Sequence, residues 1–219
     1  MNNNKKTNII VIAISIIALV ILMAFYPSLP DIIPVHWNME GQVDGTGSKS
    51  TLFFLWGVLV VSNIIIGFAE KIDPKKESYQ KFTKVFNIFR VIFALFMTGV
   101  LITNILLAIY PNMFNINNFM FPAMGILFIL MGNYMPKVKH NYTFGIKTPW
   151  TLADETVWNK THRMAGPLWV VGGLLIVAMG LIKNLEKILL PVLIIDFAVM
   201  TFVPMIYSFV LFKKQKRSE

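Results

Sequence analysis

Residues 9–26 read IIVIAISIIALVILMAFY, a run in which Ser15 is the only polar side chain before the closing Tyr26. A helix needs about 20 apolar residues to cross the hydrocarbon core of a bilayer. No small-x-small cleavage site precedes Pro27, which favours an uncleaved anchor over a secretory signal. Comparable runs recur and predict an all-α, polytopic integral membrane protein of about six transmembrane helices. The expected spans are 9–26, 52–69, 88–110, 119–135, 168–182 and 188–212.

Composition and charge support this class and suggest an orientation. Of the 219 residues, 56% are hydrophobic and 14% charged, with a mean hydropathy of +0.64. Soluble domains carry roughly 25% charged residues, so a water-soluble fold is excluded. Among 20 lysines and arginines, only Lys49, Lys183 and Lys187 fall in segments that are outer when the N-terminus is inside. Because positive residues are retained in the cytoplasm, we expect both termini there, and the net charge of +9 needs no direct contact with nucleic acid.

The loop between the first two spans is patterned rather than featureless. Three prolines within 27–34 favour an extended backbone, and the Asp44-Gly45 pair predicts a turn that reverses the chain. Two interpretations are open. In one, the loop only anchors the chain at the membrane interface; in the other, its side chains contact a ligand. The side chains concerned are His36, Trp37, Asn38, Glu40 and Asp44.

The inner connection 136–167 is the second patterned loop. Thr151 followed by Asp154 resembles a capping box and predicts a helix over 152–165, which the Gly166-Pro167 pair should end. This helix is either an amphipathic connector in the head-group layer or a site for a partner. The lysine-rich link 70–87 carries no chemical signature, and we interpret it as a solvent-exposed helical extension.

The histidines do not form a recognisable metal site. His36 is expected outside, whereas His140 and His162 are expected inside, so the three cannot share one ion. The inner pair with Asp154 and Glu155 lacks a compact ligand motif, and the absence of cysteine excludes thiolate ligands. We therefore expect no metal, no cofactor and no conventional hydrolase chemistry.

Asp196 is the one acidic residue deep within an expected span, where a carboxyl group is costly unless it has a partner or a task. It either hydrogen-bonds across helices or relays protons during transport. The polar side chains available to it within the expected spans are Ser15, Ser62, Asn63, Thr98, Thr103 and Asn104.

The two loops carry two signatures of polar, aromatic and glycine residues. The outer signature is Pro34, His36, Trp37, Asn38, Gly41, Asp44 and Gly45. The inner signature is Asn133, Tyr134, Asn141, Tyr142, Gly145, Lys147, Thr148, Pro149, Trp150, Trp158, Thr161, His162 and Arg163. With these residues the chain resembles the SdpI family of bacterial immunity proteins, including the small domain of unknown function that commonly precedes the SdpI segment. Lys147 stands where the family often has arginine, which preserves the charge.

The resemblance implies a non-enzymatic, multi-pass protein of the bacterial cytoplasmic membrane. Such a protein protects its cell from a secreted toxic peptide met on the outer side and sequesters a cytoplasmic transcriptional repressor, with the signature residues as candidate binding positions. We expect an N-terminal hairpin at 1–69, a basic linker and third span at 70–118, and an SdpI-like segment at 119–219. The residues alone leave two alternatives open: a small proton-coupled transporter that uses Asp196, and a membrane-embedded enzyme that uses the inner histidines and acids.

Overall fold

Six long helices form the protein, and the computed structural model describes residues 3–182 and 186–217. They are α1 (Asn3–Phe25), α2 (Thr51–Ile72), α4 (Thr83–Ile109), α5 (Asn117–Tyr134), α7 (Glu155–Leu181) and α8 (Glu186–Gln215). Within the described residues these six are long and apolar enough to cross a membrane, which confirms the expected number of spans. The connection between the last two expected spans, 183–187, falls mainly on residues 183–185, outside the described part of the chain.

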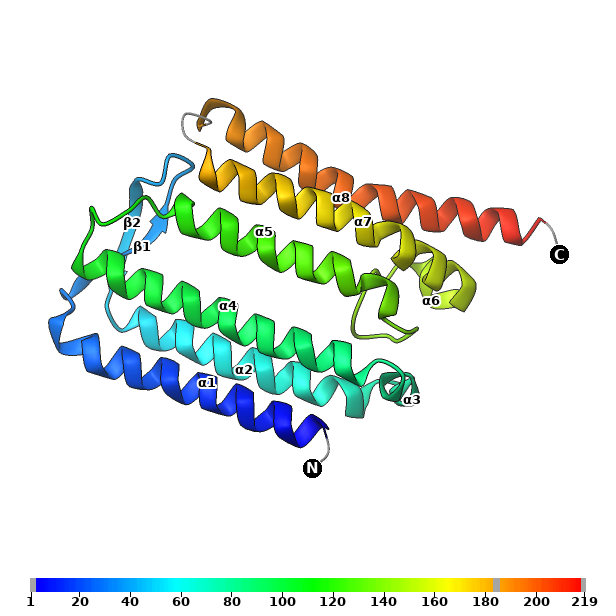
Figure 1. The fold of residues 1–219 in the computed structure, drawn as a ribbon, viewed down its shortest axis with the longest axis horizontal. Helices are drawn as coiled ribbons and strands as arrows, with labels where there is room; N and C mark the ends of the chain where they lie inside the picture. The colour runs from blue at the N-terminus through cyan, green and yellow to red at the C-terminus, as the bar shows by residue number, and fades with distance from the viewer. Residues whose placement is uncertain (1–2, 183–185, 218–219) are drawn as a thin grey trace.

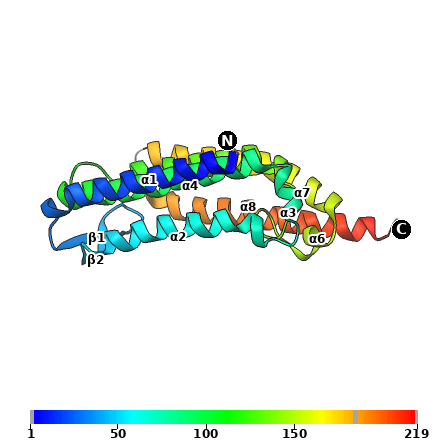
Figure 2. The same ribbon diagram turned by 90° about the horizontal axis from the view of Figure 1, so that it is seen from below.

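The helices are arranged as two groups of three. Helices α1, α2 and α4 pack together, as do α5, α7 and α8, and α4 contacts α5 where the groups meet (Figure 1). Seen from below, α2 and α8 lie in a different layer from α1, α4 and α7 (Figure 2). Helix α1 begins and α8 ends at the same end of the bundle, as an even number of spans requires.

Large apolar side chains cover the outside of the bundle. Ile9, Phe54 and Ile195 are 56%, 74% and 63% exposed, and many similar residues on all six helices are exposed too. A surface of this kind is stable against lipid but not against water, because contiguous apolar area drives association in water. The arrangement is that of a multi-pass membrane protein.

The fifth span differs from the expectation at its start. We expected a helix over 152–165 to end at Gly166-Pro167 and a new span to begin at 168, but α7 runs unbroken from Glu155 to Leu181. The predicted capping box is also wrong, because Asp154 caps α7 by accepting a hydrogen bond from the N–H of Val157 at 2.8 Å. A short helix, α6 (Pro149–Ala153), precedes it and has Thr148 as its own N-cap.

Close packing of α5 against α7 explains why the helix continues past Pro167. A Cβ atom added to Gly125 would lie 2.5 Å from the carbonyl oxygen of Gly173, and one added to Gly132 would lie 2.6 Å from that of Gly166. The two backbones therefore touch at two places, which only glycine permits. The contact at Gly166 holds the chain helical where local sequence alone favours a break.

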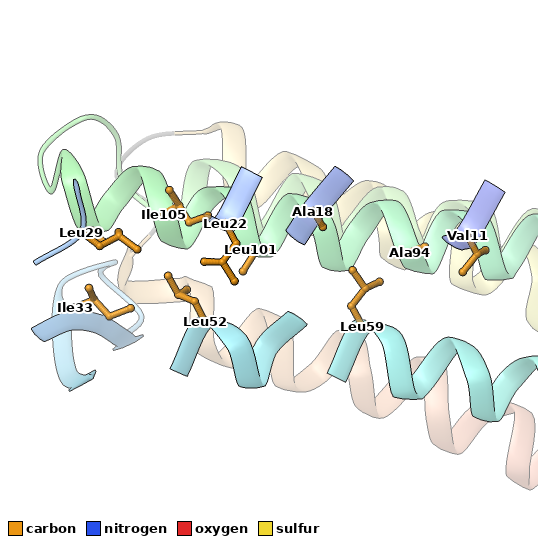
Figure 3. Close-up of a cluster of buried hydrophobic side chains, with 11 residues drawn as sticks. Val11, Ala18, Leu22, Leu29, Ile33, Leu52, Leu59, Ala94, Leu101 and Ile105 are labelled. Carbon is orange, nitrogen blue, oxygen red and sulfur yellow. The ribbon is translucent and has the colours of Figure 1, made fainter. Parts of the chain in front are cut away.

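The outer loop forms an antiparallel hairpin of β1 (Ile32–Trp37) and β2 (Val43–Ser48), an addition to the otherwise helical fold. The expected extended segment is confirmed over β1, and the chain reverses as expected. The predicted position of the turn is wrong: the reversal lies at residues 38–42, whereas Asp44 and Gly45 lie within β2 and pair with β1. Ile33 is fully buried and joins the core between α1, α2 and α4. Figure 3 shows Ile33 beside Leu29 and Leu52 at the outer end of this core, with Val11 at the opposite end.

Three short elements complete the chain. They are η1 (Tyr26–Ser28) after α1, α3 (Lys76–Gln80) between α2 and α4, and η2 (Met135–Lys137) after α5. Helices α3 and α6 lie at the end of the bundle opposite the hairpin (Figure 1). The two patterned loops therefore lie at opposite ends of the protein.

Candidate functional site

His162 anchors the inner loop from the first turns of α7, where it is fully buried. Its Nε2 accepts a hydrogen bond from the backbone N–H of Ile146 at 2.9 Å, and its Nδ1 lies 2.8 Å from the carbonyl oxygen of Trp158. A ring nitrogen that accepts from an amide carries no proton, so Nδ1 must be the donor to Trp158. His162 is thus a neutral imidazole whose two nitrogens are both occupied by the backbone.

Trp158 is sandwiched between two histidines. Its ring lies 4.1 Å from that of His162, at 20°, and 5.1 Å from that of His140, at 30°. The Nδ1 of His140 lies 2.8 Å from the Lys75 ammonium, which can only donate, so Nε2 carries the proton and points to the carbonyl oxygen of Leu152 at 3.1 Å. Burial, and then the charge of Lys75, lowers the pKa of His140 below its ordinary 6.5.

Asp73 joins this loop to the link between α2 and α4. Its Oδ2 accepts hydrogen bonds from the Tyr142 N–H (2.9 Å), the Thr143 hydroxyl (2.8 Å) and the Tyr79 hydroxyl (3.1 Å). Its Oδ1 accepts one from the Lys75 N–H at 2.7 Å. Burial alone would raise the pKa of Asp73, but these bonds to the ionised form outweigh it and hold the pKa below 3.8.

The sequence analysis missed Asp73, because the link 70–87 was interpreted as a solvent-exposed extension. That interpretation is wrong for its inward face: Tyr79, Phe82 and Phe86 are buried and pack with Trp158 in one core cluster. The Asp73-Pro74 dipeptide does signal a turn. It gives no sign that the carboxylate bonds to a loop 69 residues further along the chain.

The rest of the inner loop is tied to itself and to α8. Asn141 is fully buried, and its Oδ1 accepts from the N–H groups of Thr143 (2.9 Å) and Phe144 (2.6 Å). The Thr148 hydroxyl lies 3.0 Å from that of Ser208 in α8. The loop therefore connects both groups of helices at the end of the bundle opposite the hairpin.

Burial divides the inner signature into three sets. The buried side chains are Asn141, Thr148, Trp158, Thr161 and His162. The partly buried residues are Tyr134, Gly145 and Trp150. The exposed residues are Asn133, Tyr142, Lys147, Pro149 and Arg163. The buried side chains hold the loop to the bundle, and only the exposed residues are fully accessible to a partner.

The outer signature shapes the hairpin. Asn38 closes its turn by accepting from the N–H groups of Glu40 (3.1 Å) and Gln42 (2.9 Å), and Gly41 follows with a φ of +76°, which glycine adopts without strain. His36 Nδ1 lies 2.5 Å from the Asp44 carboxylate across the hairpin, on its solvent side.

Two asparagines fix the hairpin turn to the bundle, and the sequence analysis did not identify them. Asn115 donates to the carbonyl oxygen of Glu40 at 2.8 Å, and Asn117 donates to that of Met39 at 2.7 Å. Asn115 lies in the uncharged connection between α4 and α5, and Asn117 is the first residue of α5; the composition of this stretch shows only a turn. The hairpin is therefore a docked part of the fold.

Beneath the docked hairpin lies a largely apolar cavity of about 420 Å³ between β1, α2, α4 and α5. Its wall includes Ile33, Trp37, Phe54, Asn104, Met120 and Phe121. Asn38 and Asn117 also line it and offer polar atoms at its edge. Such a cavity suits an apolar side chain with a polar backbone beside it.

Asp196 does not reach the partners considered for it. It is 8% exposed, and its Oδ2 has no hydrogen-bond partner among the described residues. Gly172 on α7 leaves the space that its carboxyl group occupies, since an added Cβ would lie 2.8 Å from Oδ1. Ser15, Ser62, Asn63, Thr98 and Asn104 instead bond to carbonyl oxygens of their own helices. Within the described residues, no three His, Asp or Glu side chains gather as metal ligands.

Comparisons with known proteins agree with the two loop signatures. Residues 137–208 match the SdpI/YfhL protein family, and residues 13–61 match a domain of unknown function, DUF1648. The chain is 26% identical over 190 residues to "Immunity protein SdpI" of Bacillus subtilis (strain 168), covering 87% of this chain and 89% of that relative. No solved structure matches the chain.

Proposed function

We propose that this chain, which carries an SdpI/YfhL family segment, is an immunity protein of a bacterial cytoplasmic membrane that protects its cell from a secreted toxic peptide. The observation that carries the proposal is the similarity to an immunity protein across most of both chains. Its orientation follows from the distribution of lysine and arginine, which puts the hairpin outside and both termini in the cytoplasm.

The peptide meets the protein at the hairpin. The apolar cavity beneath β1 takes an apolar side chain of the peptide, with Trp37 as the large aromatic contact. The side chains of His36 and Asp44 stand exposed on the hairpin and offer hydrogen bonds to the peptide from the solvent side. Asn115 and Asn117 already hold the hairpin turn in place. Binding the peptide therefore costs little conformational entropy in the hairpin, which favours affinity.

A cytoplasmic repressor meets the opposite end. The exposed members of the inner signature, with Lys147 and Arg163 as cations, offer a basic surface there. This surface is held to the link after α2 by Asp73 and His140, and to α8 by Thr148. The two matched segments support the division into an N-terminal hairpin unit (1–69), a linker and span (70–118), and a C-terminal SdpI-like unit (119–219).

The test is survival together with binding. Sensitive cells that express the chain are challenged with synthetic copies of short secreted peptides encoded beside its gene. Trp37→Ala should lower both protection and peptide binding by about tenfold or more, because it removes an aromatic anchor. Val43→Ala is the matched control, since Val43 pairs with Trp37 across the hairpin but lies outside the cavity.

Membrane abundance is measured for each variant so that loss of protein is not mistaken for loss of binding. If both variants protect like the parent, the hairpin is only a structural element. If no peptide is bound and the parent confers no survival, the immunity function itself is wrong.

A further inference from the structure

A second cavity, of about 730 Å³, lies between α1, α2 and α4 at the inner end of the bundle, away from both signatures. It overlaps the core of Figure 3 at Val11, and at its other end the indole N–H of Trp56 donates to the carbonyl oxygen of Ser15 at 2.9 Å. Its upper wall is apolar and includes Ile12, Ile16, Val60 and Ile64. Three of these four side chains also face outward at the bilayer, so the cavity is continuous with lipid.

The mouth of this cavity is positively charged. Lys5, Lys71 and Arg90 line it, against one carboxylate, Glu70. Glu70 accepts a hydrogen bond from the Asn4 side chain at 2.8 Å, and no ion pair within 4.0 Å joins it to Arg90 in the described part of the chain. The site therefore carries an excess of positive charge.

Arg90 is the residue that points most directly to an anionic ligand in this cavity. It is 6% exposed, its Nη1 donates to the Asn8 side chain at 2.9 Å, and its Nε has no hydrogen-bond partner among the described residues. Glu70 is near enough for its charge to act on Arg90, but it makes no direct ion pair with the guanidinium in the described part of the chain. A buried guanidinium without such a pair is costly, and a bidentate anion such as a phosphate group satisfies it best.

We propose that this cavity binds one anionic phospholipid, with its phosphate at Arg90, Lys5 and Lys71 and an acyl chain along α1 and α2. The combination of a basic mouth at the ends of two helices with an apolar wall open to the bilayer selects a lipid over a soluble anion. In the orientation proposed above, the lipid comes from the cytoplasmic leaflet. The site is independent of the immunity function.

Two glycines on α2 provide a variant that should disturb Arg90 and a matched control that should not. A Cβ atom on Gly67 would lie 2.7 Å from Arg90 Nη2, so Gly67→Ala displaces the guanidinium, whereas a Cβ on Gly57 meets nothing within 4 Å. Lys71→Gln removes one exposed cation at the mouth, and Lys76→Gln removes an exposed cation outside the cavity.

The experiment is native mass spectrometry of the purified full chain in detergent with phosphatidylglycerol, phosphatidylcholine or inorganic phosphate. The parent should retain one phosphatidylglycerol. Gly67→Ala and Lys71→Gln should retain it roughly tenfold more weakly, while Gly57→Ala and Lys76→Gln match the parent. Equal retention of phosphatidylcholine, equal retention by Gly67→Ala, or binding of inorganic phosphate in place of the lipid would each overturn the proposal.

Discussion

Gly145 and His162 touch: a Cβ atom on the glycine would lie 2.5 Å from the imidazole Nε2, and the glycine has a φ of +115°. Gly145→Ala should therefore lower the free energy of unfolding by about 2 kcal/mol or more, because it adds both backbone strain and a clash. Thermal unfolding of the purified protein measures this. Gly57→Ala is the control, since it has free space in a helix and should be neutral or slightly stabilising.

Asp73→Asn should destabilise the inner loop. Asp73 accepts four hydrogen bonds as a carboxylate, and an amide nitrogen cannot accept those that reach it, so a loss of about 2 kcal/mol is expected. Because the folded pKa lies below 3.8, the contribution of Asp73 is present above the ordinary pKa and is lost as the pH falls through the folded value. The parent should lose this stability only below about pH 4. A melting temperature with the same low-pH dependence in both proteins would contradict this account.

His140 should make the stability of the protein depend on pH in a higher pH range than Asp73 does. Its folded pKa lies below 6.5, so the unfolded chain takes up a proton first and the folded state loses relative stability as the pH falls below 6.5. His140→Gln should reduce the decline of the melting temperature between about pH 7 and pH 5. An unchanged decline in His140→Gln would contradict this account.

Reporter fusions test the orientation. Fusions after Lys76, Lys147 and Lys214 should report the cytoplasm, and fusions after Asp44 and Asn115 the exterior, because of the lysine and arginine distribution. An exterior signal at Lys147 would reverse the assignment of both loops.

Asp196→Asn should keep protection at normal membrane abundance. The carboxyl group has one oxygen without a partner and sits in space left by Gly172, so an amide of the same size fits without breaking a bond to that oxygen. Loss of protection together with a pH-dependent ion flux in the parent would instead support a transporter.

Hydropathy was sufficient to predict the six spans, because each long apolar run has few alternatives to crossing the bilayer. The hairpin was predictable in part, because the prolines favour an extended backbone locally, but the turn was misplaced: it lies at residues 38–42 and not at Asp44-Gly45. Local sequence patterns wrongly predicted a helix end at Gly166-Pro167, where contact with Gly132 keeps the helix continuous. They also failed at Asp73 and Asn115, whose partners lie far away in the sequence.

The glycine contacts between α5 and α7 also constrain how the protein can move. On each helix the two glycines are seven residues apart, about two turns, and the helices are antiparallel, so Gly125 meets Gly173 as Gly132 meets Gly166. Sliding or rotating one helix against the other would bring a side chain onto a backbone carbonyl. The two helices should therefore move together as one unit, so that a displacement of one helix at the hairpin end carries the other with it.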